Sequence, residues 1–143
     1  MKIKRWLFLT IPFAFLLIGL VLAFAKPMIR VTQETDETGK TIWNVVAVGL
    51  SFRQFFISPD IDSVEIYENG EWKPCPFNPG MENTKSGMYL ISLNQPGEKK
   101  SIFKKLDFVF NLSAAGHYRV GLTVYTDIDE EKSFRVVCEF RVR

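Results

Sequence analysis

Residues 117–125 read His-Tyr-Arg-Val-Gly-Leu-Thr-Val-Tyr, and residues 134–142 read Phe-Arg-Val-Val-Cys-Glu-Phe-Arg-Val. In each stretch every second side chain is apolar, and in the later one polar positions such as Arg135 and Glu139 lie between them. This period of two is required of a β-strand that has one face on a core and the other in water. The polar connection at residues 126–132 therefore predicts an antiparallel hairpin.

Further short segments with strand character precede this hairpin and are separated by turn residues. Asn69-Gly70 is a strong two-residue turn, the polar run Gln33–Lys40 reads as a loop, and no convincing helix is found after residue 25. The predicted strands are residues 28–32, 41–50, 63–68, 71–73, 88–93 and the second half of 101–110. Short strands at this spacing predict an all-β fold, with residues 26–143 forming one antiparallel β-sandwich domain.

The N-terminal 25 residues have a different composition. Met1–Trp6 contains three basic residues, and the 19 residues Leu7–Ala25 carry no charge. A basic head followed by an apolar run is typical of a signal peptide, and Ala23-Phe24-Ala25 offers small residues for cleavage before Lys26. The alternative is an uncleaved signal anchor that keeps residues 1–25 in contact with the membrane. Both interpretations place residues 26–143 outside the cytoplasm, either secreted or tethered to the cell membrane.

Charge and composition exclude several classes of function. The 143-residue chain has a net charge of +2, and without the three basic residues of its head it has 15 basic against 16 acidic groups. A nucleic-acid-binding protein needs a basic face, which this balance does not favour. One histidine and two cysteines make a zinc site very unfavourable, and we expect no cofactor. His117 has no neighbouring nucleophile and acid, so we do not expect an enzyme.

Three local clusters have a binding interpretation beside a plain structural one. Acidic side chains at 127, 129 and 131 could converge on calcium, or they form a solvated hairpin tip. Four lysines within residues 99–105 could bind an anionic surface, or they form a solvated face. Phe52, Phe55 and Phe56 cannot all face inward on one strand, so one of them could belong to a partner surface unless both faces are covered.

Cys75 and Cys138 are the only two thiols. In an exported chain an even pair favours a disulfide, which would close a long loop. The alternative is two unpaired cysteines, with Cys138 acting as a small core residue because it alternates with the apolar positions of its strand. No Cys-x-x-Cys motif is present, so a redox function is not expected.

Residues 112–120 read Leu-Ser-Ala-Ala-Gly-His-Tyr-Arg-Val and resemble a tyrosine corner. In that motif the hydroxyl of a tyrosine, here Tyr118, bonds back to backbone a few residues upstream. Gly116 is then expected to provide the tight turn and Leu112 to fill the core beneath it. We expect Trp43 and Trp72 to be structural as well.

Together with Asn69-Gly70-Glu71-Trp72 and the pair Glu139-Phe140, this motif makes residues 63–143 resemble a bacterial immunoglobulin-like domain of Gram-positive extracytoplasmic proteins. The resemblance implies an immunoglobulin-like sandwich in an envelope protein, with no catalytic residues. The expected function is a non-enzymatic module that acts through protein–protein contact at the cell envelope. The alternative is an envelope protein whose sandwich binds or senses a small ligand or ion.

Overall fold

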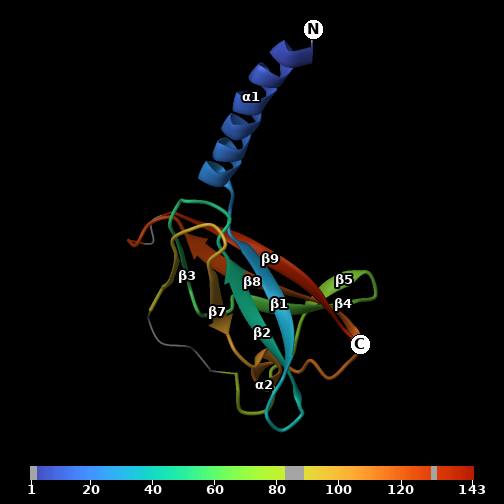
Figure 1. Ribbon diagram of the computed structural model, residues 1–143. Helices are drawn as coiled ribbons and strands as arrows, with labels where there is room; N and C mark the ends of the chain where they lie inside the picture. The colour runs from blue at the N-terminus through green and yellow to red at the C-terminus, as the bar shows by residue number, and fades with distance from the viewer. Residues whose placement is uncertain (1–2, 83–88, 130–131) are drawn as a thin grey trace.

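The computed structural model describes residues 3–82, 89–129 and 132–143, and of residues 3–9 it describes the backbone only. The strands form two antiparallel sheets around one core, so the chain after its first helix is mostly β, as predicted (Figure 1). In chain order the elements are α1 (Ile3–Phe24), β1 (Met28–Thr35), β2 (Thr41–Val48), β3 (Phe55–Ile57), β4 (Ser63–Glu68), β5 (Glu71–Pro74), β6 (Ile91–Leu93), β7 (Lys99–Phe103), α2 (Leu106–Val109), β8 (Gly116–Tyr125) and β9 (Ser133–Val142).

Strand β8 holds the larger sheet together. The smaller sheet has the order β1-β2-β7, and the larger one has six strands. β9 pairs with β8 over its whole length, from Gly116↔Val142 to Tyr125↔Ser133. The other edge of β8 pairs with β4 and, further along, with β3. β5 and β6 then extend β4 and β3 outward, so every strand of this sheet depends on β8 directly or through one neighbour.

The inner face of β8 supplies the centre of the core. Its four inward side chains, Tyr118, Val120, Leu122 and Val124, are completely buried. On β9 the side chains of the same phase pack against this core and are partly buried, whereas the alternating ones are exposed. The alternation predicted for both strands is therefore confirmed.

Two turns show how local sequence fixes the hairpins. Asn69-Gly70 joins β4 to β5 with φ of 53° and 88°, the left-handed values that this two-residue turn requires. The connection between β1 and β2 is shorter than the predicted polar loop, because Gln33–Thr35 continue β1. The turn begins at Asp36, whose carboxylate accepts hydrogen bonds from the backbone N–H groups of Thr38 and Lys40 at 2.9 Å.

Residues 101–110 contradict the prediction of a strand in their second half. β7 ends at Phe103, and the next element is the helix α2. Leu106 and Val109 are both buried, because positions three apart lie on one face of a helix. Phe108 consequently points outward and is 57% exposed. The prediction that no helix follows residue 25 was therefore wrong.

Other boundaries shift by a few residues. β2 ends at Val48, two positions before the predicted end, because Gly49 turns the chain toward the loop at residues 95–98. β6 covers only Ile91–Leu93 of the strand predicted at 88–93, and Met88 lies outside the described residues.

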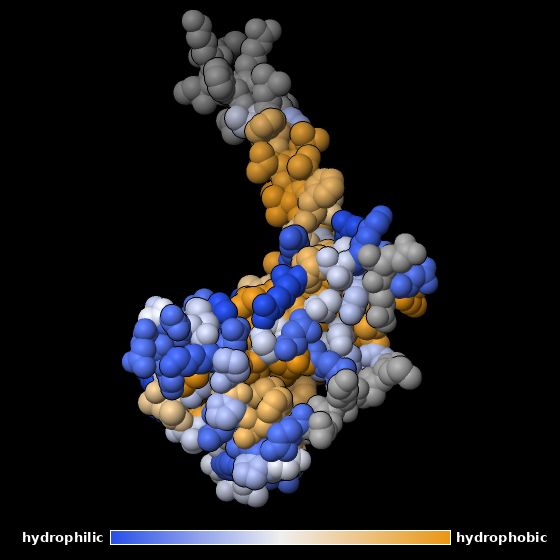
Figure 2. Space-filling view, turned by 180° about the vertical axis from the view of Figure 1, so that it is seen from behind, coloured by the Kyte–Doolittle hydropathy of each residue, from blue (hydrophilic) through white to orange (hydrophobic). Residues whose placement is uncertain are grey.

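Helix α1 leaves the sandwich at the start of β1 and projects away from it (Figure 1). Figure 2 shows that the described side chains of α1 form an almost entirely hydrophobic surface that extends away from the domain. Its carboxyl end meets the domain where the backbone N–H of Phe52 donates to the carbonyl of Leu22 at 3.0 Å. Within the described residues, no helix combines the length and the hydropathy that a membrane crossing needs. The exposed apolar side chains of α1 include Ile11, Phe13, Phe15, Leu16, Leu17, Ile18, Leu20, Val21 and Phe24.

Of the two alternatives for Cys75 and Cys138, the structure has the unpaired one: both residues are free thiols. The N–H of Cys75 bonds to Val64 of β4, whereas Cys138 lies on β9 opposite Val120 of β8. β4 and β8 thus lie between the two cysteines, a separation of roughly 14 Å at about 4.8 Å per strand. A disulfide requires Cα atoms within about 7 Å, so the strand order prevents the bond. Cys138 packs against the core, as the alternative prediction has it.

Candidate functional site

The start of β8 is tied to the loop that precedes it. The hydroxyl of Tyr118 donates a hydrogen bond to the carbonyl of Ala114 at 2.8 Å, in the direction that a tyrosine corner requires. Leu112 is buried in the core. Gly116 differs from the expectation, because it is the first residue of β8 and does not have a positive φ. A Cβ at this position would meet Ile66 at an ordinary 3.4 Å.

Trp72 lies on the outer face of the larger sheet rather than in the core. The Asn-Gly turn places it opposite Tyr67, and the two ring centroids are 5.1 Å apart. His117 of β8 approaches the same indole to 5.2 Å, and the guanidinium of Arg119 lies over it at 4.4 Å. We call Tyr67, Trp72, His117 and Arg119 the outer-face cluster. Trp43, by contrast, packs against the core as expected.

Arginine side chains on this face are held by one carboxylate. Glu65 and Arg119 occupy opposite positions of β4 and β8 and form two hydrogen bonds of 2.7 and 2.9 Å. Arg135 crosses over β8 from β9 and brings its guanidinium to 3.8 Å from Glu65. Gly121 permits this crossing, since a Cβ there would lie 2.6 Å from the guanidinium. The outer face therefore presents arginine side chains in fixed orientations.

The Glu65 carboxylate makes stability depend on pH. The hydrogen bonds from Arg119 hold the pKa of Glu65 below its ordinary value of 4.5. A lowered pKa in the folded state adds stability above pH 4.5, and this contribution is lost as the pH falls through the folded-state value. Thermal melts between pH 7 and 3 should therefore show a smaller acid-dependent drop in Tm for Glu65→Gln than for the unmodified protein. Glu71→Gln, at the exposed hairpin tip, should keep the full drop, and equal drops in all three proteins would contradict the prediction.

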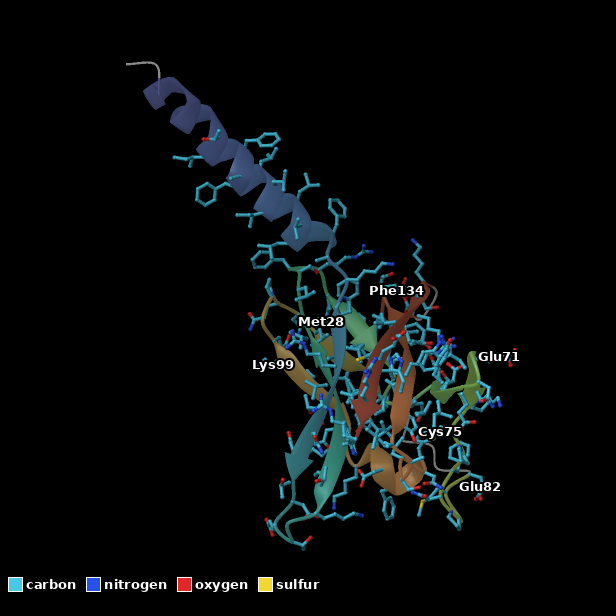
Figure 3. The ribbon with its side chains drawn as sticks, turned by 90° about the vertical axis from the view of Figure 1, so that its right-hand side faces the viewer. Met28, Glu71, Cys75, Glu82, Lys99 and Phe134 are labelled. Atoms are coloured by element: carbon cyan, nitrogen blue, oxygen red, sulfur yellow. The ribbon has the colours of Figure 1, made fainter. Side chains whose placement is uncertain are left out.

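A cavity of about 710 Å³ opens between the β4–β5 hairpin and α2. Figure 3 shows two of its lining residues, Cys75 and Glu82, on the same side of the molecule below the hairpin residue Glu71. The volume lies within the range of small-molecule binding sites. Its apolar lining includes Val64, Cys75, Phe77, Phe103, Val109 and Phe110.

The cavity exists because the chain leaves the sheet early on this side. Pro74 and Pro76 lack the N–H that a sheet ladder needs, so β5 ends there. The chain then runs to α2, where the amide of Asn78 donates to the carbonyls of Asp107 and Phe108 at 2.8 and 3.0 Å. These carbonyls belong to the last turn of a short helix and have no partner within it. The loop therefore bridges hairpin and helix, and the cavity lies between them.

The lining of the cavity also contains four carboxylate residues. Among the described residues no lysine, arginine or histidine lines the cavity. Asp62 and Glu82 are exposed and so lie toward its opening, whereas Val64 and Cys75 are buried at its base. Asp62 accepts a hydrogen bond from the hydroxyl of Thr123 at 2.8 Å. The carboxylate residues of the lining are Asp60, Asp62, Glu65 and Glu82.

The thiol in the cavity wall is inert at neutral pH. Cys75 Sγ donates to the carbonyl of Asn111 at 3.3 Å. Burial raises the pKa of Cys75 to about 11, so the thiol stays protonated and is not a nucleophile. Burial also raises the pKa of Cys138. His117 lies on the outer face, where its Nε2 is 3.0 Å from a carboxylate oxygen of Glu139, and it does not line the cavity.

The remaining candidate clusters are dispersed. In the calcium hypothesis Glu131 lies outside the described residues, and no metal-binding group of three or more side chains occurs among the residues that are described. The four lysines at 99–105 are exposed, and Lys100 pairs with Glu98 at 3.1 Å. Phe52 is 70% exposed while Phe55 is buried, so the prediction that these phenylalanines do not all face inward is confirmed.

No family model, no curated protein and no solved structure matches the chain. The sequence predictions missed both the outer-face cluster and the cavity. A signal for the first was present: Tyr67 alternates out of phase with the core residues Val64 and Ile66, and the Asn-Gly turn pairs it with Trp72. The cavity carried no such signal, because it depends on the distance between a hairpin and a helix of four residues.

Proposed function

We propose that the chain is a non-enzymatic, extracytoplasmic immunoglobulin-like module that contacts a protein partner at the cell envelope. The contact surface is the outer face of β5, β4, β8 and β9. The observation that carries the proposal is the outer-face cluster, which places a tryptophan, a tyrosine, a histidine and an arginine side by side outside the core. Tryptophan, tyrosine and arginine are the residue types that contribute most binding energy in protein interfaces.

The side chains of the outer-face cluster are also preorganised for binding. Tyr67 is 45% exposed, and Trp72 is half-buried beside it. Arg119 is already fixed by its two hydrogen bonds to Glu65 and by the indole beneath it. A partner therefore immobilises few additional torsions, which lowers the entropic cost of association.

The location and the fold family rest on separate support. Two antiparallel sheets and the bond from Tyr118 to Ala114 support the immunoglobulin-like assignment. The uncharged run Leu7–Ala25 and the exposed apolar side chains of α1 support export directed by residues 1–25. Cleavage after Ala25 releases the domain, and retention of the helix tethers it.

Site-specific photo-cross-linking tests the contact surface. A benzoylphenylalanine is placed at position 67 and the protein is irradiated in the cells that produce it. We expect a discrete cross-linked product, and we expect Trp72→Ala to lower its yield by about tenfold, as loss of a central interface residue does. The mass of the uncross-linked chain from the same cells distinguishes a chain cleaved after Ala25 from an anchored one.

The matched control places the same group at Tyr89, which is 64% exposed and is not part of the cluster. Position 89 should give no discrete product. Equal products from positions 67 and 89, or a product from position 67 that is insensitive to Trp72→Ala, would exclude the outer face as the contact surface. Circular dichroism verifies that each variant is folded.

A second function is favoured by the cavity. An apolar space of about 710 Å³ with a few convergent polar groups is the usual form of a small-molecule site. We propose small-ligand binding or sensing as the second candidate function. It uses a different region from the protein contact, so the two functions can be tested separately.

A further inference from the structure

We infer that the cavity takes a small organic cation, with an apolar body inside it and a protonated amino group at its opening. This inference rests on the second candidate function, ligand binding, and specifies the chemical class of the ligand. It follows from the difference between the base of the cavity and its opening.

The base of the cavity suits an apolar body. Val64, Cys75 and Val109 are buried there and belong to the core. Phe77 and Phe110 also line it, with ring centroids 4.9 Å apart in a stacked arrangement, and Phe77 is 43% exposed. A ligand that covers these surfaces removes apolar area from water, which favours binding.

The opening suits a positive charge. The single negative charge of Glu65 is more than compensated by the guanidinium groups of Arg119 and Arg135. Asp62 accepts its hydrogen bond from a neutral hydroxyl, which leaves its negative charge in place. Glu82 adds a second carboxylate on the side of the 76–82 loop. Among the described residues, the four carboxylates of the lining outnumber the two guanidinium groups at Glu65, so the net local charge is negative and attracts cations.

The aromatic walls favour the same class of ligand. An ammonium group within about 6 Å of a ring centroid is attracted to the face of the ring. Phe77 lies on the loop that carries Glu82, so one ligand can contact a ring and a carboxylate together. A carboxylate or phosphate ligand gains neither contact.

The test uses three probes that share one apolar body and differ in charge: 4-phenylbutylamine, 4-phenylbutanol and 4-phenylbutyrate. Their binding to the full-length protein is measured by isothermal titration calorimetry at pH 7. We expect the amine to bind about tenfold more tightly than the alcohol, since a charge-assisted hydrogen bond contributes about this much. We expect no binding of the carboxylate.

Variants then locate the site. Glu82→Gln should weaken the amine several-fold and leave the alcohol unchanged, and Glu82→Lys should abolish the preference for the amine. Glu71→Gln and Glu71→Lys are the matched controls. Like Glu82, Glu71 is an exposed glutamate, but it lies at the start of β5 and does not line the cavity. Phe77→Ala should weaken both probes, and the amine more than the alcohol, because the ring contacts the apolar body and also attracts the ammonium group. Its circular dichroism spectrum verifies folding.

Each alternative outcome contradicts one part of the proposal: the charge of the ligand, ligand binding itself, or the location of the site. Equal affinities for amine and alcohol would overturn the cationic ligand and leave ligand binding in place. Binding of none of the three probes would overturn ligand binding itself. Equal effects of the Glu82 and Glu71 variants would exclude the cavity as the binding site. None of these results changes the cross-linking expected at position 67.

Discussion

Tyr118→Ala is expected to lower the free energy of unfolding by about 3–5 kcal/mol, the range for truncation of a buried aromatic residue. Tyr118 is completely buried at the start of the inner face of β8 and stacks on Phe140 with ring centroids 5.6 Å apart. Its removal leaves a cavity beneath the strand on which the larger sheet depends. Urea denaturation at pH 7, with stability extrapolated to water, measures the loss. Because small domains are stable by about 5–15 kcal/mol, the variant is expected to be close to unfolding at 37 °C.

Tyr118→Phe separates the hydroxyl from the ring. It removes only the hydrogen bond from the hydroxyl to the carbonyl of Ala114. Because Ala114 is exposed, a water molecule can donate to that carbonyl instead. The expected loss is about 1 kcal/mol. If Tyr118→Phe were as destabilising as Tyr118→Ala, the ring would not be the main source of stability at this position.

Gly49→Ala is expected to lower the free energy of unfolding by about 2–3 kcal/mol, the upper part of the range for forced steric overlap. A Cβ at Gly49 would collide with the carbonyl oxygen of Gln95, which is backbone and cannot rotate away. Two backbone hydrogen bonds also join these segments. The N–H of Gly49 donates to the carbonyl of Glu98 at 2.8 Å, and the N–H of Gly97 donates to the carbonyl of Gly49 at 2.9 Å. Thermal and urea denaturation measure the loss.

Gly116→Ala is the matched control. The atoms nearest to its added Cβ would be side-chain atoms of Ile66 and Tyr118 at 3.4 Å, and its φ is not left-handed. We expect its stability to change by less than about 0.5 kcal/mol, as at an unconstrained site. A large loss in Gly116→Ala together with a small one in Gly49→Ala would reverse the roles that the structure gives these two glycines.

The parts of the fold that sequence reasoning found are those fixed by neighbouring residues. The alternation in β8 and β9 is local, and Asn69-Gly70 specifies its hairpin through two φ values. Helix α2 was missed because four residues are too few for a helical period to emerge, and its phenylalanines mimic alternation. Its position depends on contacts with residues far away in the sequence, such as the hydrogen bond from the backbone N–H of Trp43 to the carboxylate of Asp107 at 3.0 Å.

The outer-face cluster and the state of the two cysteines could not be predicted, because both depend on the order of the strands in the sheet. No short segment of the sequence specifies that order. Cys75 and Cys138 both face the core, as a disulfide needs, but β4 and β8 lie between them. The same strand order brings Arg119 to Glu65, 54 residues apart, and so orients the outer-face cluster. The residues of this cluster come from β4, β5 and β8, which no single segment of the sequence brings together.

The dependence of the larger sheet on β8 also determines when the chain can fold. β1 and β2 form a hairpin between adjacent segments, which closes a short loop and is fast. β3 and β4 must instead pair with residues of β8 that lie more than fifty positions later in the chain. Until Gly116–Tyr125 is available, β4 can pair only with β5 and β3 only with β6, and the edges of β3 and β4 that face β8 have no partner. The core therefore cannot be completed before β8 is available, and we expect this long-range pairing, rather than the early hairpins, to limit the folding rate.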